Sequence, residues 1–184
     1  MKAVFCTQYG PPEVLKIQIT GIPKPKNNEV LIKINATAVN SGDVRIRGLV
    51  VEGFMKVVMR FVLGFRRPRN PILGVVLSGV VEKVGKDVKD WNPGDEVYAM
   101  TGMKFGAYAE YIVLKTNAVM AHKPKNATFE QAAAILFGGH TAIYFLQKAK
   151  IDEYPNKKVL IYGASGAVGT TAIQIAKYNK ADIK

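Results

Sequence analysis

The segment from Gly163 to Gly169 has the residue types and the spacing of a phosphate-binding turn. It follows the apolar run 159–162 and precedes a helix-forming stretch from Thr170 to Tyr178. Glycine in such a turn lets backbone N–H groups approach a pyrophosphate, and the N-terminus of the next helix favours its negative charge. We interpret residues 157–178 as a buried strand, a tight turn and a helix, the first half of a dinucleotide-binding βαβ unit.

The turn departs at one position from the usual Gly-x-Gly-x-x-Gly fingerprint. Aligned on Gly166 and Gly169, the first glycine of the pattern is replaced by Ala164. Gly166 is expected to admit the pyrophosphate, and Gly169 to let the helix pack on the strand. The expected cofactor-binding residues of the turn are Ala164, Ser165, Gly166, Ala167, Val168 and Gly169. A strand-to-helix turn without a ligand is the alternative interpretation of the same glycines.

Helical patterns precede this turn. Thr128 has the character of a helix N-cap, and apolar residues follow it as far as Phe137. The pair Gly138-Gly139 interrupts the pattern, and a second helical stretch is expected over residues 141–150. The change in character places a domain boundary near residues 122–127.

The first 121 residues show short strands separated by turns. Apolar and polar side chains alternate between residues 29 and 39, which indicates a strand with one buried face. The expected strands are 3–7, 15–20, 29–39, 75–84, 96–100 and 108–114. Such regular spacing indicates a compact, barrel-like β domain.

One segment, Glu52 to Gly64, breaks the β pattern. Its apolar residues at helical spacing are Phe54, Val57, Val58 and Phe61, and arginines follow at 66, 67 and 69. A membrane-surface helix is one interpretation, because apolar residues beside a basic cluster are typical of it. We favour a core-facing or cleft-covering helix, because its polar face is poor for an interfacial helix.

Composition argues against several classes of protein. The net charge is +12, but the cations are spread along the chain without the interleaved aromatic residues of single-strand binders. Nucleic acid is therefore not the expected partner. No apolar run approaches the roughly 18 residues of a membrane span, and the N-terminus lacks the pattern of a signal peptide. We expect a cytoplasmic protein with no membrane partner.

The cysteine and the histidines offer little chemistry by themselves. Cys6 is the single cysteine, which excludes an internal disulfide and a multi-thiolate zinc site, and we interpret it as a core thiol. His122 and His140 are candidates for acid–base work by residue type. We interpret His122 as a surface residue and His140 as a packing residue at a helix start.

Several separated motifs together resemble the medium-chain dehydrogenase/reductase superfamily, in its zinc-independent quinone oxidoreductase-like branch. These motifs are Gly10-Pro11-Pro12-Glu13-Val14-Leu15, Ala38-Val39-Asn40-Ser41-Gly42-Asp43, 74–85, Pro93-Gly94-Asp95-Glu96-Val97, Gly106-Ala107-Tyr108-Ala109-Glu110-Tyr111, Ala132-Ala133-Ala134, Gly139-His140-Thr141-Ala142 and 163–169. The resemblance implies an α/β plus β fold. A GroES-like β-barrel domain would occupy residues 1–124, and linking helices with the first part of a Rossmann-type domain would occupy 125–184. In that family the active site lies between the two domains.

The resemblance also bears on metal. In the zinc-dependent alcohol dehydrogenases, a Cys-x-x-Asp segment and a Gly-His-Glu segment supply zinc ligands. The matching segments here are Asn40 to Asp43 and Gly74-Val75-Val76. Asparagine is a poor zinc ligand and the valines have no donor atoms, so we expect no zinc.

The activity implied is hydride transfer from NAD(P)H, with NADP(H) favoured over NAD(H), to a quinone or an α,β-unsaturated carbonyl. Carried over, Asn40 would line the substrate site and donate a hydrogen bond to a carbonyl oxygen, and Asp43 would order that segment. Thr141 would lie close to the nicotinamide. Asn40 and Asp43 are also ordinary turn formers, and Thr141 could be an N-cap. Many relatives carry tyrosine where this chain has Arg45, which leaves the proton donor open.

The cofactor site is begun in this chain but not finished. The residue that reads the ribose 2′ position falls about 20 residues after the start of the fingerprint, at or beyond Lys184. The residues themselves therefore leave NAD versus NADP open. We expect weak or no cofactor binding by the 184-residue chain, an exposed sheet edge, and a homo-oligomer at full length. The alternative is a non-catalytic relative that acts as a binding module, for example for RNA.

Overall fold

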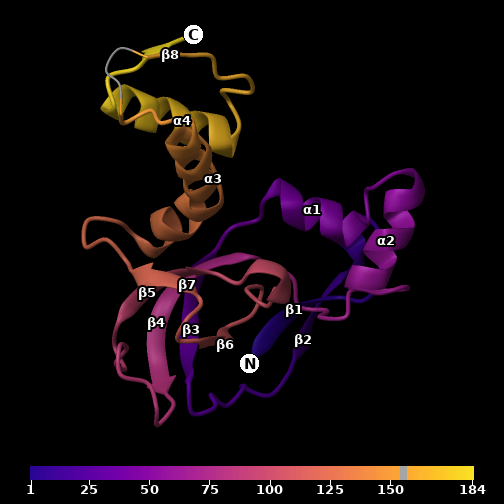
Figure 1. The fold of residues 1–184 in the computed structure, drawn as a ribbon. Coiled ribbons are helices and arrows are strands. Elements are labelled where there is room, and N and C mark those ends of the chain that lie inside the picture. The colour runs from indigo at the N-terminus through magenta and orange to yellow at the C-terminus, as the bar shows by residue number, and fades with distance from the viewer. Residues whose placement is uncertain (154–156) are drawn as a thin grey trace. The chain divides into compact units, whose positions relative to one another are not determined.

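The computed structural model describes residues 1–153 and 157–184. The chain divides into two compact units, Met1–Ala133 and Ala134–Lys184. Figure 1 shows their secondary structure, and each unit is considered by itself.

The main sheet of the first unit has five antiparallel strands in the order β6-β3-β4-β5-β7 (Figure 1). The strands are β3 (Glu29–Thr37), β4 (Val76–Val84), β5 (Glu96–Met100), β6 (Tyr111–Lys115) and β7 (Val119–His122). Val30 and Ile32 of β3 are fully buried, as the alternation in the sequence predicted. Leu77 and Val97 join them in one hydrophobic core. The sheet is curled, so the barrel-like β fold is confirmed, while β7 was not anticipated.

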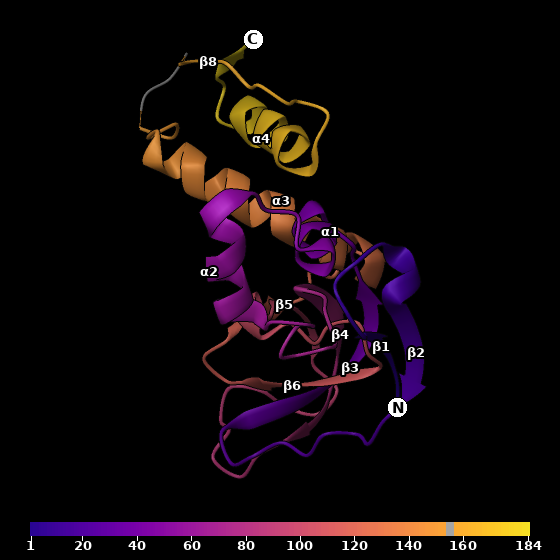
Figure 2. The same ribbon diagram turned by 90° about the vertical axis from the view of Figure 1, so that its right-hand side faces the viewer.

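A two-stranded antiparallel hairpin, β1 (Lys2–Cys6) and β2 (Leu15–Ile19), completes the strands of this unit. Figure 2 shows the two strands side by side, and the short helix η1 (Pro12–Val14) lies in their connection. Isolated bridges from Ala3 and Phe5 tie β1 to other segments of the unit. The Cys6 thiol is fully buried in a second core, which confirms its interpretation as a core thiol, and burial raises its pKa.

Two helices follow β3: α1 (Ser41–Gly48) and α2 (Gly53–Leu63). Helix α1 lies where the sequence indicated only turn formers. Helix α2 confirms the helix expected between Glu52 and Gly64. Of the two placements expected for it, the core-facing one is wrong for most of its surface, and the cleft-covering one stays a prediction. Leu63 is its buried residue, while Phe54 and Phe61 are exposed. One further short helix, η2 (Gly102–Lys104), precedes β6.

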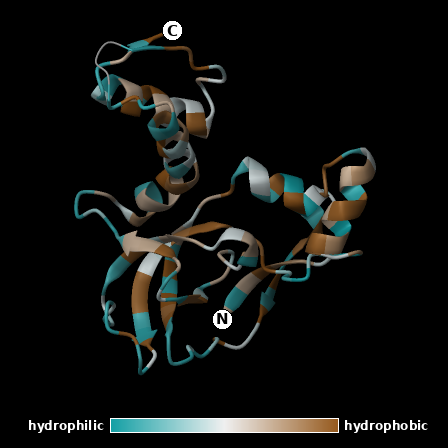
Figure 3. Cartoon of the chain, in the orientation of Figure 1, coloured by the Kyte–Doolittle hydropathy of each residue, from teal (hydrophilic) through white to brown (hydrophobic). Residues whose placement is uncertain are grey.

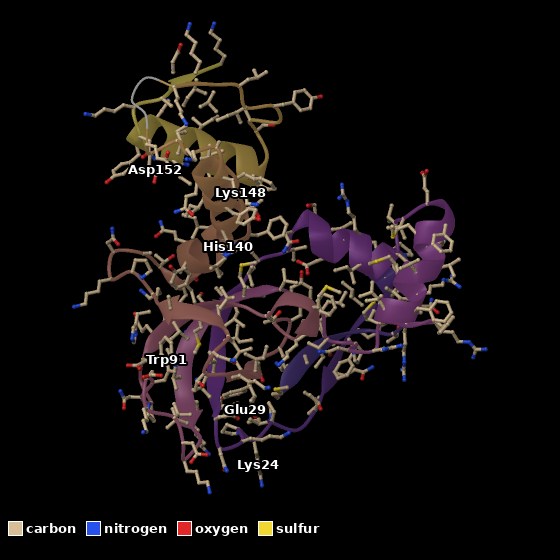
Figure 4. The ribbon with its side chains drawn as sticks, in the orientation of Figure 1. Lys24, Glu29, Trp91, His140, Lys148 and Asp152 are labelled. Atoms are coloured by element: carbon tan, nitrogen blue, oxygen red, sulfur yellow. The ribbon has the colours of Figure 1, made fainter. Side chains whose placement is uncertain are left out.

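Helix α3 (Phe129–Lys148) runs without a break through Gly138 and Gly139, so the predicted interruption is wrong. Gly138 serves packing instead. A Cβ atom on Gly138 would lie 2.5 Å from the carbonyl oxygen of Ala167 in α4, closer than such atoms can approach. His140 consequently lies inside the helix, and it is exposed rather than packed at a helix start (Figure 4).

The second unit also contains β8 (Lys158–Val159), α4 (Ala167–Tyr178) and β9 (Asp182–Ile183). Strands β8 and β9 pair in parallel, and α4 packs with them around a core that includes Ala172 and Ala176. The predicted strand 159–162 is shorter than expected and is not buried: Leu160 is 80% exposed and Tyr162 is fully exposed. Among the described strands β8 has β9 as its partner and no other, so Leu160 and Tyr162, which follow β8, lack a neighbouring strand that would cover them.

The order of elements agrees with the predicted α/β plus β fold: an antiparallel β unit first, then the strand–turn–helix start of a Rossmann-type unit. No helix among the described residues is long and apolar enough to cross a membrane.

Candidate functional site

Asn40 and Asp43 are brought together at the N-terminus of α1. Asn40 is the N-cap, and its Oδ1 accepts hydrogen bonds from the N–H groups of Gly42 at 2.8 Å and Asp43 at 3.2 Å. Asp43 Oδ2 accepts in return from the N–H of Asn40 at 3.0 Å. This reciprocal arrangement is a capping box, which satisfies donors that a helix start leaves unpaired. The segment is therefore a helix start and not a simple turn.

Three polar atoms beside this box have no hydrogen-bond partner although they are buried. Among the described residues they are Asn40 Nδ2, Asp43 Oδ1 and the hydroxyl of Tyr108. The Asp43 side chain is the most enclosed of the three residues, with 3% of its surface exposed. We call these residues the Asn40–Asp43–Tyr108 cluster.

The surroundings of this cluster raise the pKa values of Asp43 and Tyr108. Burial raises the pKa of the Asp43 carboxyl, and the hydrogen bond from the Asn40 N–H offsets part of that rise. Burial and the nearby Asp43 carboxylate raise the pKa of Tyr108 well above its usual value. The two groups are thus close enough to affect each other's pKa, but their geometry falls short of a hydrogen bond. Tyr108 is neutral at physiological pH and keeps its proton.

A buried amide donor without a partner costs on the order of 1–3 kcal/mol. Proteins tolerate such groups mainly where a ligand or water completes them. The Asn40 Nδ2 group can donate to a carbonyl oxygen, which is the role that the family resemblance implied for it. Tyr108 was not anticipated, because it is far from Asn40 in the sequence and no spacing rule links the two. The one available signal was its place in the Gly106–Tyr111 motif.

The second candidate region is the glycine-rich turn before α4. A Cβ atom on Gly169 would lie 2.3 Å from the carbonyl oxygen of Gly163, so glycine is required there for the helix to pack on its own turn. A Cβ atom on Gly166 would meet no atom closer than 3.5 Å. No contact among residues 1–153 and 157–184 therefore requires glycine at 166, whereas close approach of a pyrophosphate would.

The N-terminus of α4 is also open to a ligand. Gly166 is its N-cap, and no side chain caps the helix among the described residues. Ala164, Ser165 and Ala167 are exposed on the same turn. First-turn N–H groups without a side-chain cap form a favourable place for a phosphate. The six residues expected from the fingerprint thus lie together at this helix start, 164–166 in the turn and 167–169 in the first turn of α4.

Thr141 lies on α3, one helical turn beyond Gly138, where α3 crosses the start of α4. Its hydroxyl donates to the carbonyl oxygen of Phe137 at 2.7 Å. Thr141 is therefore not an N-cap, and its oxygen is left as an acceptor.

The histidines take no part in these arrangements through hydrogen bonds among the described residues. His122 is exposed, which agrees with its interpretation as a surface residue, and its ring centroid lies 4.8 Å from that of Trp91. In residues 1–153 and 157–184, no group of three or more His, Cys, Asp and Glu side chains is placed to hold a metal ion.

Known proteins show clear likeness to this chain. Residues 26–125 match the family described as alcohol dehydrogenase GroES-like domain. A 2-methylene-furan-3-one reductase of Solanum lycopersicum is 38% identical over 97% of this chain and 44% of the relative. A quinone oxidoreductase of Sus scrofa is 37% identical over 96% of this chain and 50% of the relative. The chain spans about half the length of the curated relatives it matches.

Solved structures agree with these matches. The quinone oxidoreductase from Coxiella burnetii has a TM-score of 0.84 and 33% identity, covering 100% of this chain and 55% of that chain. The Escherichia coli quinone oxidoreductase complexed with NADPH has a TM-score of 0.80 and 28% identity, covering 100% of this chain and 51% of that chain. Sequence motifs, fold and relatives agree, and the chain belongs to the alcohol dehydrogenase GroES-like family of the medium-chain dehydrogenase/reductase superfamily.

Proposed function

We propose that this chain supplies the substrate-binding unit and the first half of the cofactor site of an oxidoreductase. The reaction is hydride transfer from NAD(P)H to a quinone or an α,β-unsaturated carbonyl. The observation that carries this proposal is the buried Asn40 amide, which has a free donor and is held in place by the capping box with Asp43. The names of the relatives, among them an NADPH-dependent alkenal/one oxidoreductase of Arabidopsis thaliana, support the same reaction class.

Asn40 acts on the carbonyl oxygen of the substrate. Negative charge grows on that oxygen when hydride reaches the conjugated carbon, and a fixed N–H donor stabilises the charge without reorganising. Asp43 is a positioning residue, because its Oδ2 holds the Asn40 backbone at 3.0 Å. We assign Arg45, in α1, no role in proton transfer, and the final proton comes from solvent.

The cofactor is held at α4. Residues 164–169 would cradle the pyrophosphate through backbone N–H groups at the uncapped helix start, and the Thr141 oxygen would accept from the nicotinamide carboxamide. When bound, the nicotinamide supplies the hydride. We favour NADP(H) over NAD(H), because NADPH is named for both the Arabidopsis relative and the Escherichia coli structure.

The chemistry requires no zinc. Asn40 and the valines at 75 and 76 stand where the zinc-dependent relatives carry ligands, and these side chains cannot build a tetrahedral nitrogen and sulfur site. The proposed domain limits are 1–124 and 125–184, supported by the family match that ends at residue 125. We also propose that the full-length protein is a cytoplasmic homo-oligomer.

The test is NADPH oxidation by the protein of the full reading frame, with an enone or a quinone as acceptor and with or without a chelator. We expect turnover that the chelator does not change. Loss of turnover on chelation would overturn the metal-free mechanism. Absence of turnover with every acceptor, together with salt-dependent retention on RNA, would favour the non-catalytic binding module.

A further inference from the structure

Helix α2 turns its apolar side chains away from the unit to which it belongs. Leu63 is buried, with 4% of its surface exposed, whereas Phe54 is 80% exposed and lies about 180° from Leu63 around the helix. The other exposed apolar residues of this arc are Met55, Val57, Phe61 and Val62, and Phe65 follows just after the helix. Figure 3 shows the hydrophobic colouring along α2. A helix that covers a core would show the opposite arrangement.

Arg60 borders the apolar arc, about 60° from Val57 around the helix, whereas Lys56 lies about 20° from the buried Leu63. The acidic residue at the start of the helix is its N-cap, Glu52. Lys56 and Arg60 are on α2, and Arg66, Arg67 and Arg69 follow it, while residues 53–81 contain no Asp or Glu. None of these five side chains forms an ion pair among the described residues. Arg69 instead donates to the carbonyl oxygen of Phe61 at 2.7 Å, which fastens the basic segment to the helix.

A hollow of about 690 Å³ opens beside these arginines. Its lining residues are Thr7, Gln8, Tyr9, Arg60, Phe65, Arg66 and Arg67. The Tyr9 hydroxyl donates to the carbonyl oxygen of Gly64 at 2.8 Å, so the wall of the hollow is held to the end of α2. Three guanidinium groups without carboxylate partners make this a place for phosphate groups.

We propose that α2 and the basic segment through Arg69 form a surface that binds membranes containing anionic lipids. The apolar arc enters the boundary between headgroups and acyl chains, as in other interfacial helices. Arg60, Arg66 and Arg67 contact lipid phosphates at the level of the headgroups, with the hollow receiving one of the phosphates. The protein stays peripheral, on the leaflet that carries the negative lipids.

Charge selects the membrane over a second copy of this chain as the occupant. A symmetric dimer through α2 would bring the same patch of both copies together, and each patch carries five cations against the single carboxylate of Glu52 at the start of the helix. Like charges would then meet where the apolar residues pack, which is unfavourable. An anionic lipid surface can bury the apolar side chains and also neutralise the cations.

The test is sedimentation of the 184-residue chain with phosphatidylcholine vesicles, with and without phosphatidylserine. We expect binding that requires phosphatidylserine and weakens with salt. Phe54→Ser/Phe61→Ser should abolish it, and Arg66→Glu/Arg67→Glu should weaken it at least about thirtyfold, from roughly 1 kcal/mol per basic residue. These four side chains are exposed, so the variants are expected to fold.

Matched controls separate the surface from general charge and hydrophobicity. Lys24→Glu/Lys26→Glu changes the net charge equally at exposed sites (Figure 4 labels Lys24), and Ile17→Ser/Ile19→Ser removes exposed apolar residues of β2. Both controls should bind like the original chain. Equal binding to both vesicle types, or equal losses in test and control variants, would overturn the proposal. Self-association of the chain that Phe54→Ser/Phe61→Ser removes, with no binding to vesicles, would also overturn it. The same holds for vesicle binding that inorganic phosphate abolishes but that Phe54→Ser/Phe61→Ser leaves unchanged.

Discussion

The side chains of Asn40 and Asp43 each hold the backbone of the other residue. Asn40 Oδ1 accepts from the Asp43 N–H at 3.2 Å, and Asp43 Oδ2 accepts from the Asn40 N–H at 3.0 Å. This exchange fixes the Asn40 side chain through its oxygen and leaves its Nδ2 donor buried without a partner. The capping box that starts α1 therefore also holds the Asn40 amide in position.

Removal of the Asp43 side chain is predicted to weaken the start of α1. Asp43→Ala should lower the free energy of unfolding by about 1 kcal/mol, because one half of the capping box is lost. Urea denaturation of the 184-residue chain measures this. Asp43→Asn is the matched control, since an amide oxygen can still accept from the Asn40 N–H. Equal losses in both variants would contradict a capping role.

The raised pKa of the buried Asp43 carboxyl predicts that stability depends on pH. Burial raises the folded-state pKa of Asp43 above its ordinary 3.8, so between those two values the folded chain binds more protons than the unfolded chain. Its contribution to stability therefore falls as the pH rises from 3.8 through the folded-state value. Asp43→Asn cannot ionise, so its stability relative to the original chain should increase over that window and then level off.

Unfolding free energies of the two chains, measured from acid to neutral pH, test this prediction. A difference that stays constant over the whole range would show that the carboxyl has an ordinary pKa in the folded state.

Two glycines of the turn are predicted to differ in what they do. Gly169→Ala should destabilise the second unit by roughly 1–3 kcal/mol, because its Cβ would clash with the Gly163 carbonyl. Gly166→Ala should leave stability nearly unchanged, because the space there is open, but should weaken NADPH binding by the full-length protein at least about tenfold. Thermal denaturation and NADPH titration check the two effects. Normal NADPH binding by Gly166→Ala would contradict the role assigned to Gly166.

The glycine pair of α3 offers a similar contrast. Gly138→Ala places a Cβ 2.5 Å from the Ala167 carbonyl oxygen and should cost about 1–3 kcal/mol. The Cβ of Gly139→Ala would lie 3.3 Å from the flexible, exposed Ile135 side chain and 3.8 Å from the Thr171 methyl, an ordinary contact. Better helix propensity should offset the tighter of the two. Thermal denaturation of the two variants compares them. A larger loss in Gly139→Ala would contradict the packing described for α3 and α4.

The sequence allowed the regular parts of the fold to be predicted. Alternation located β3, helical spacing located α2, and the glycine fingerprint located α4, because each of these signals is local. Helix α1 was missed because Asn40 and Asp43 favour turns and helix starts equally, and only the backbone geometry decides between them. The interruption expected at Gly138 was wrong because glycine there packs closely against Ala167 of α4. This contact, between residues distant in the sequence, outweighs the poor helix propensity of glycine.

The candidate site was predictable only in part, because some of its contacts join residues that are distant in the sequence. Asn40, Asp43 and the turn 164–169 could be named from motifs, but Tyr108 reaches Asp43 from a distant segment. The exposure of Leu160 likewise depends on which strands lie beside β8 and not on its own sequence.

The most direct measurement of the central claim is kcat of Asn40→Ala in the full-length protein, with NADPH and an enone in the presence of a chelator. Asn40→Asp serves as the control, because a carboxylate keeps the cap at α1 but cannot donate. We predict that kcat falls about 10²–10³-fold in both variants, since each loses the donor to the developing oxyanion. A kcat within about twofold of the original protein in Asn40→Ala would contradict the role assigned to this amide.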